Sequence, residues 1–144
     1  MQGIKVGRWL AGGVIAGLIM WLIEGGASGL YQAGIEAALQ AHNLSPVTGA
    51  HTLLIGIVAS LLAGLTMIFF YAAARPRFGP GPRTAVTVAV ALWIGGYLPP
   101  LLGYHVLGLF PTRMLGLWAV VGLVEMVIAG LGGAWIYREP GPGA

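Results

Sequence analysis

Four long apolar runs, at about residues 9–30, 47–74, 84–107 and 114–137, make up most of this 144-residue chain. A helix of about 20 consecutive apolar residues crosses the ~30 Å hydrocarbon core of a bilayer. In that core every backbone polar group needs a hydrogen-bond partner within the protein, so only helices and closed barrels span it. The runs therefore predict an all-α integral membrane protein, a four-helix bundle forming a single transmembrane domain over residues 1–144.

The composition agrees with this prediction. The chain is 58% hydrophobic and 8% charged, with a mean hydropathy of +0.87, whereas an average soluble domain is about 25% charged. The excess apolar surface predicts contact with a lipid bilayer. The chain has no cysteine, which excludes disulfides, thiolate metal sites and iron–sulfur clusters.

The basic residues lie at the ends of the apolar runs and form no continuous stripe, so they do not predict a nucleic-acid partner. If the chain crosses the membrane four times, six of its seven lysine and arginine residues lie on one side and Arg113 lies on the other. The six are Lys5, Arg8, Arg75, Arg77, Arg83 and Arg138. Because positive charge is enriched on the cytoplasmic side, both termini are expected in the cytoplasm of a bacterium, with the spans in its inner membrane.

Two segments between the runs have their own character. Residues 75–83 contain three prolines, two glycines and three arginines, which predicts a cytoplasmic loop. In residues 31–43 the apolar side chains recur at helical spacing and the polar ones point elsewhere. This pattern predicts a short amphipathic helix at the membrane interface, between the first and second spans.

Small residues recur four positions apart in several runs, as they do where membrane helices approach closely. The predicted packing positions are Gly13, Gly17, Gly56, Ser60, Gly64, Gly130 and Ala134. Four helices cannot all direct every row of small residues toward the inside of the bundle. Some of these faces are therefore expected to contact another membrane subunit or a second copy of the chain.

Glu125 has eleven residues of the last run before it and twelve after it. At ~1.5 Å per residue it lies roughly 16 Å into the membrane, whereas Glu24 lies roughly 22 Å across from the other side. An ionisable group at such depth is costly and marks a functional site by default. A carboxyl group in apolar surroundings also favours its neutral form.

The candidate partners of the two acids are the side chains of Tyr97, Tyr104, Thr66 and Ser60 and the backbone carbonyls that Pro99 and Pro100 leave free. Two adjacent prolines remove two donors and predict a kink or an unwound turn in the third span. One interpretation is a proton relay or cation site between helices. The alternative is structural: a protonated Glu125 bonded to a neighbouring backbone carbonyl, which ties two helices together.

The histidines His42, His51 and His105 all map to the outer side. A haem or metal held by His51 and His105 is a third interpretation, but no spacing motif supports it, and no cofactor or metal is predicted. A bound haem or pigment stays open. The chain also lacks nucleotide-binding, hydrolase and zinc-protease motifs, so it is not expected to be an enzyme.

Residues 71–85, together with 122–125 and 133–137, resemble a set of small bacterial four-span membrane proteins that have no assigned activity. The resemblance implies the same span count and assigns no catalytic residue. Two functions therefore stay open. The first is a non-catalytic structural or accessory subunit of a larger, bioenergetic membrane assembly. The second is a small homo-oligomeric transporter or channel that uses Glu125 and Glu24.

Overall fold

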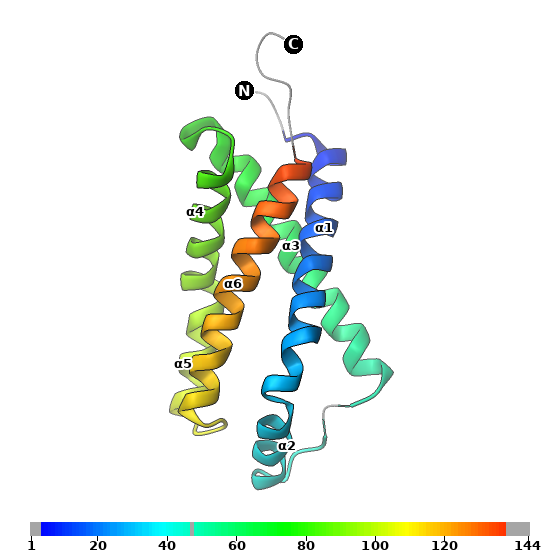
Figure 1. Cartoon of the computed structure of the whole chain (residues 1–144), viewed down its shortest axis with the longest axis vertical. Helices are drawn as coiled ribbons and strands as arrows, with labels where there is room; N and C mark the ends of the chain where they lie inside the picture. The colour runs from blue at the N-terminus through cyan, green and yellow to red at the C-terminus, as the bar shows by residue number, and fades with distance from the viewer. Residues whose placement is uncertain (1–3, 47, 138–144) are drawn as a thin grey trace.

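The computed structural model describes residues 4–46 and 48–137, and over these ranges the chain is all-helical, without a strand (Figure 1). The elements in chain order are α1 (Val6–Ala27), the 3-10 turn η1 (Ser28–Leu30), α2 (Gln32–Ala41), α3 (Ala50–Phe78), α4 (Pro82–Leu92), the π-helical turn η2 (Trp93–Tyr97), α5 (Leu98–Val106) and α6 (Thr112–Ile136).

Four segments of the described chain are long and apolar enough to cross a membrane: Val6–Leu30, Ala50–Phe78, Pro82–Val106 and Thr112–Ile136. The predicted all-α architecture with four long apolar helices is confirmed. Length and hydropathy together fit a multi-pass membrane protein. The second span was predicted to begin at residue 47, and Arg138 was predicted to lie on the cytoplasmic side. Both residues lie outside the described ranges.

The four segments run up and down side by side. α6 packs on both α1 and α4, and α3 crosses behind it and packs chiefly on α1 (Figure 1). The start of α1, the α3–α4 connection and the end of α6 share one end of the bundle, called here the basic end. α2 and the α5–α6 connection lie at the other end, called here the α2 end.

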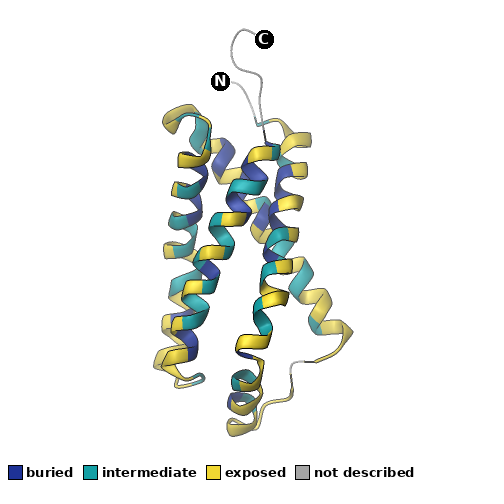
Figure 2. Cartoon of the chain, in the orientation of Figure 1, coloured by how far each residue is buried: buried dark blue, intermediate teal, exposed yellow. Residues whose placement is uncertain are grey.

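The buried core lies in the basic half of the bundle, where all four long segments converge. Its members are mostly small or flexible: Ala16, Met20, Met67, Ile68, Tyr71, Ala72, Ala85, Val88, Ala89, Ala129, Ala134 and Tyr137. Large apolar side chains such as Leu22, Leu102 and Trp135 are exposed instead. Exposed positions follow the outer faces of the helices (Figure 2). This distribution fits helices whose outer faces meet lipid.

Glycines set the closest approach, between α1 and α3. A Cβ atom added at Gly17 would lie 2.7 Å from the Leu61 Cα, and one added at Gly13 would lie 2.8 Å from the Leu65 Cα. A side chain at Gly64 would overlap the backbone of Gly13 and Gly17. These glycines therefore allow the two backbones to touch.

Two of the other predicted packing residues, Gly130 and Ala134, lie in the core region: Gly130 faces Met67, and Ala134 is buried. Gly56 was expected to pack as well, but nothing lies within 4 Å of an added Cβ there. The reason is that α1 and α3 diverge beyond their crossing. A close contact between Gly12 and Gly133, on α1 and α6, was not predicted.

The connection between α3 and α4 is shorter than the predicted loop of residues 75–83. α3 continues to Phe78 with Pro76 in its last turn, and α4 begins at Pro82. The Gly79 N–H donates to the Arg75 carbonyl at 2.8 Å, which keeps the last turn closed in spite of the proline. Pro82 takes the first helical turn, where its missing N–H costs nothing.

Two hydrogen bonds fix this reversal. The Gly81 N–H donates to the Tyr71 hydroxyl at 3.1 Å, and the Thr84 hydroxyl donates to the Gly79 carbonyl at 2.7 Å. Gly79 and Gly81 have φ values of +81° and +124°, which glycine adopts without steric cost. The turn is therefore built by glycines and side-chain bonds, and the arginines remain in helical turns beside it.

The third long segment changes geometry just before Pro99 and Pro100. The Leu98 N–H donates to the Trp93 carbonyl, five residues back, which makes η2 a π-helical turn. The Trp93 indole N–H donates to the Ala119 carbonyl of α6 at 2.9 Å. The paired prolines thus coincide with an altered helical turn that is held against α6.

α2 is a separate helix that follows α1 through η1. Ala38 on α2 is buried, and an added Cβ at Gly34 would lie 2.8 Å from the Met114 sulfur. The opposite face is exposed, and there the Gln32 amide donates to Glu36 at 3.1 Å. The helix ends at Ala41, before Asn43 with φ 54°. Its location at a membrane interface stays a prediction.

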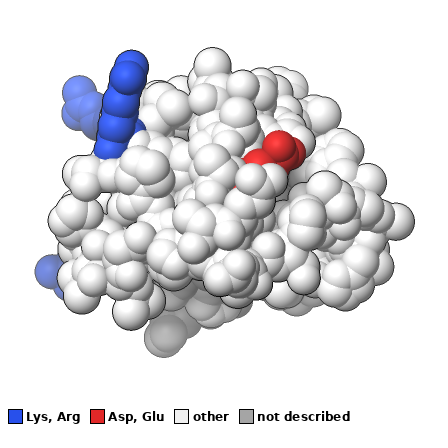
Figure 3. Space-filling view, turned by 90° about the horizontal axis from the view of Figure 1, so that it is seen from below, with Lys and Arg blue, Asp and Glu red and all other residues white. Residues whose placement is uncertain are grey.

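Charge is unevenly distributed. Lys5, Arg8, Arg75, Arg77 and Arg83 are at the basic end, whereas Arg113 begins α6 at the α2 end. Viewed from the α2 end, few charged side chains are visible on an otherwise uncharged surface (Figure 3).

Candidate functional site

The two predicted intramembrane acids meet in the structure. Glu24 lies in the last turns of α1, and Glu125 lies in the middle of α6. The two side chains are within hydrogen-bonding reach of each other. The Oε2 atom of Glu125 is buried and has no hydrogen-bond partner among the described residues. The site is therefore a carboxyl pair contributed by two helices, in which the Glu125 Oε2 atom can still accept a hydrogen bond.

Tyr31 supports the Glu24 carboxyl. Its hydroxyl donates a short hydrogen bond to Glu24 Oε1, and its ring packs edge-on against Trp118 of α6 with centroids 5.6 Å apart. Burial, and then the bond to Glu24, raises the pKa of Tyr31. The hydroxyl therefore keeps its proton and stays a donor to the carboxylate.

Tyr97 reaches the same place from the third segment. It is the last residue of η2, and its ring lies directly over Gly122, where any Cβ would overlap it. Both Glu24 and Glu125 are close enough for their charges to act on the Tyr97 hydroxyl. The extra residue of the π turn and the missing side chain at Gly122 together place this hydroxyl beside the carboxyl pair.

The surroundings supply no compensating positive charge. Within the described part of the chain, Glu24 is the charged group that acts on Glu125, and no basic side chain does. Two carboxylates this close repel each other. A shared proton or a bound cation would relieve that repulsion.

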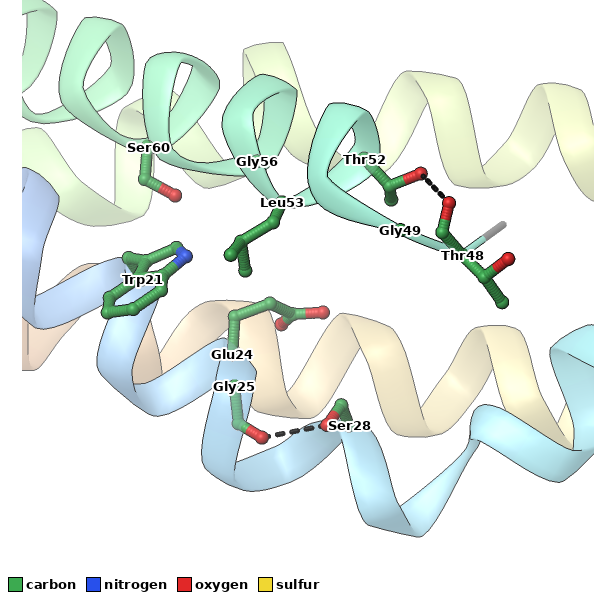
Figure 4. A pocket seen from close by; sticks show the side chains of 10 residues that line it. All are labelled: Trp21, Glu24, Gly25, Ser28, Thr48, Gly49, Thr52, Leu53, Gly56 and Ser60. Carbon is green, nitrogen blue, oxygen red and sulfur yellow. Dashed lines mark hydrogen bonds between the residues drawn. The ribbon is translucent and has the colours of Figure 1, made fainter. Parts of the chain in front are cut away.

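The pair is open on one side. Glu24 is exposed and lines an open cleft of about 360 Å³ between α1 and α3, whereas Glu125 is only partly exposed (Figure 4). Toward the basic end the way is closed by the α1–α3 crossing at Gly17 and by Ala16 and Ile68, both at 0% exposure. The carboxyl pair is thus reached from the α2 end.

Tyr104 was predicted to belong to this site and does not. It lies on α5, 38% exposed, with its ring packed edge-on against Phe110 at 5.7 Å. The π turn ends at Tyr97, and α5 then carries Tyr104 to the α2 end. Pro99 and Pro100 lie in the first turn of α5 and are exposed, so they shape the helix near Tyr97 and do not line the cleft.

The histidines lie at separate places in the structure, on or directly after different helices. The His105 Nδ1 atom lies 3.3 Å from the Thr112 hydroxyl, and His51 is exposed in the first turn of α3. Across the described ranges no group of three or more His, Asp or Glu side chains has an arrangement that could hold a metal ion. The geometry therefore does not support a metal site, and a haem held by His51 and His105 stays an interpretation of the sequence.

Tyr31, Trp118 and Gly122 were missed as site residues. Tyr31 follows Glu24 by seven residues, which is two helical turns and the same helix face. Gly122 precedes Glu125 by three residues and so shares its face. The spacing in the sequence could therefore have indicated that Tyr31 and Gly122 belong to the site. Nothing in the sequence indicated that the aromatic ring of Trp118 packs on Tyr31.

Replacing Tyr31 by phenylalanine is expected to lower the free energy of unfolding by about 1–3 kcal/mol, because the buried Tyr31 side chain loses its hydrogen bond to the Glu24 carboxyl group. Denaturant unfolding in detergent, followed by circular dichroism, measures the change. The control is Tyr104→Phe, since the Tyr104 hydroxyl makes no hydrogen bond within the described part of the chain and its ring packs on Phe110. An equal loss in both variants would show that the bond to Glu24 contributes nothing.

Comparison with protein-family models, with curated proteins and with solved structures finds no match to this chain.

Proposed function

We propose that this multi-pass membrane protein binds a proton at the Glu24–Glu125 pair and exchanges it for a cation, as a small transporter without covalent catalysis. The observation that carries the proposal is the meeting of two carboxyl groups, one from α1 and one from the middle of α6, without a basic partner among the residues that the structure describes. Intramembrane acids that face a cavity are typical of proton and ion pathways.

The chemistry of the pair suits exchange. When one proton is shared, one carboxyl donates to the other, and Tyr31 adds a second donor. When that proton leaves, two negative charges face each other and attract a cation from the cleft. Proton and cation therefore compete for the same carboxyl oxygens, which is the condition for coupled exchange.

The one-sided access supports a transport cycle. The carboxyl pair opens toward the α2 end, and the glycine crossing of α1 on α3 closes the other side. A helix pair that touches through glycines at one level can change its angle there with little side-chain rearrangement. We infer that α1 and α3 rock about Gly17 and Gly64 to expose the pair to the opposite side.

The experiment is proton movement in proteoliposomes. Purified full-length chain is reconstituted, a gradient of a monovalent cation is imposed, and a trapped pH-sensitive dye reports internal pH. We expect an internal pH change that follows the direction of the cation gradient and is absent from protein-free vesicles. Equal traces with and without protein would contradict the proposal.

We further propose that the chain lies in the bacterial inner membrane with the basic end in the cytoplasm. Five described basic residues cluster at that end and one lies at the other, as the positive-inside rule requires. α2, which is amphipathic and follows the first long segment, then lies in the outer interface.

Single cysteines test this orientation cleanly, because the chain has no native cysteine. Phe78→Cys and Leu107→Cys replace residues that are 63% and 69% exposed at opposite ends of the bundle. A membrane-impermeant maleimide added to intact spheroplasts is expected to label position 107 at once and position 78 only after permeabilisation. Labelling of position 78 in intact spheroplasts would reverse the proposed topology.

A second candidate function, an accessory subunit of a larger bioenergetic membrane assembly, is favoured by one observation. Near the end of α1 and in η1 an added Cβ at Gly25, Gly26 or Gly29 would meet nothing within 4 Å. Such glycines leave a smooth surface that another helix can approach. Purification in mild detergent tests it: a partner in fixed ratio supports a subunit, and a lone chain contradicts it.

A further inference from the structure

The cleft beside Glu24 has the features of a ligand site. It lies where α1 and α3 diverge from their glycine crossing, and it holds about 360 Å³, within the usual range of small-molecule pockets (Figure 4). Its lining residues are Trp21, Glu24, Gly25, Ser28, Thr48, Gly49, Thr52, Leu53, Gly56 and Ser60.

Its charge selects a cation. Glu24 is the one ionisable side chain among the lining residues. The groups that face Glu24 from the other packed elements are Tyr31, Tyr97 and Glu125, which bring two hydroxyls and a second carboxyl and no positive charge. α3 adds no ionisable group to the lining. An anion is therefore repelled and a cation attracted.

The hydroxyl groups add acceptors. The Ser28 hydroxyl already donates to the Gly25 carbonyl at 2.7 Å, and the Thr52 hydroxyl donates to the Thr48 carbonyl at 3.3 Å (Figure 4). Each of these hydroxyls has a single hydrogen, which is engaged, so its oxygen offers only lone pairs to a ligand. This again favours a positively charged ligand.

The walls favour an organic ligand over a bare metal ion. A hard cation such as Mg²⁺ or Ca²⁺ needs six or more oxygen ligands in close array. The cleft instead offers one carboxyl, scattered hydroxyls, and the apolar surfaces of Trp21 and Leu53. Gly25, Gly49 and Gly56 leave open space beside them, since an added Cβ there meets nothing within 4 Å.

We propose that this cleft binds an organic monocation with an apolar body, its charge at Glu24 and its body against Trp21 and Leu53. The proposal rests on the proposed exchange function and names the cation of that exchange. An indole face attracts a quaternary or primary ammonium through its negative π cloud. Binding to a protonated pair gives the carboxylate–cation pair and one released proton.

Calorimetry on the full chain in detergent tests the proposal with benzyltrimethylammonium as the probe. Titrations in two buffers of different ionisation enthalpy count the protons released. We expect saturable binding with about one proton released. We also expect the affinity to fall up to about tenfold for each pH unit of acidification while the proton competes. The uncharged analogue with carbon in place of nitrogen is expected not to bind.

Three variants locate the site. Glu24→Gln is expected to abolish measurable binding, and Trp21→Leu to weaken it roughly 2- to 30-fold through loss of the cation–π contact. Glu36→Gln, which changes an exposed glutamate on α2 outside the cleft, is the matched control and is expected to bind as the unchanged chain does. Binding that survives Glu24→Gln, or equal binding of the uncharged analogue, would overturn the proposal.

The two proposals fail separately. If proteoliposomes exchange protons for an inorganic cation and the probe does not bind, the organic ligand is wrong and the exchange function stands. If the probe binds at Glu24 and no proton moves across the membrane, the cleft is a ligand site and the transport function is wrong.

Discussion

Replacing Gly64 by valine is expected to lower the free energy of unfolding by about 3 kcal/mol, at the upper end of the usual cost of overpacking. Any side chain at this position overlaps the backbone of Gly13 and Gly17 on α1. Backbone cannot move aside as the tip of a flexible side chain does, so α1 and α3 must separate. Unfolding by denaturant in mixed micelles, followed by circular dichroism, measures the loss.

Gly56→Val is the matched control, with the same chemical change in the same helix. Nothing lies within 4 Å of an added Cβ at Gly56, so the stability is expected to change by no more than about 0.5 kcal/mol. If both variants lost the same stability, a general effect of valine in α3 would explain the result, and the crossing at Gly64 would have no special role.

Glu125→Gln is expected to reduce cation-driven proton movement in proteoliposomes to the level of protein-free vesicles. Glutamine keeps the shape of the side chain and its hydrogen-bonding capacity, but it neither takes up nor releases a proton. Glu24 then has no partner with which to share one. Initial rates of internal pH change, at equal amounts of reconstituted protein, measure the effect.

The third described glutamate supplies the control. Glu36 lies on the exposed face of α2, where Gln32 donates to it, and its replacement by glutamine is expected to leave the rate unchanged. A Glu125→Gln variant with the full rate would contradict the proposed exchange. Such a result would leave the carboxyl pair a purely structural link between α1 and α6.

The sequence predicted the architecture well because membrane helices carry a strong signal. Run length and hydropathy alone located the four segments, since the bilayer sets both. The α3–α4 connection was predicted too long because composition suggested a loop over residues 75–83. The helix in fact extends to Phe78, closed by the Gly79 N–H, so hydrogen bonding decided an end that composition did not.

The candidate site was predicted in part. Two acids in apolar runs are visible from the sequence, and Tyr97 was chosen with them. Tyr104 was included with them, but it lies seven residues beyond Tyr97, about 10 Å further along α5, where its ring packs against Phe110. The cleft was not foreseen. It depends on the angle at which α1 and α3 diverge, and that angle arises from packing between segments far apart in the chain.

The most direct test of the central claim, that Glu24 and Glu125 hold an exchangeable proton, is infrared difference spectroscopy of the full chain in lipid. The carbonyl stretching band of a protonated carboxyl group is followed as pH is raised and compared between the unchanged chain and the Glu24→Gln, Glu125→Gln double variant. We predict a titrating band that is present in the unchanged chain and missing from the double variant. Identical spectra from the two proteins would contradict the claim.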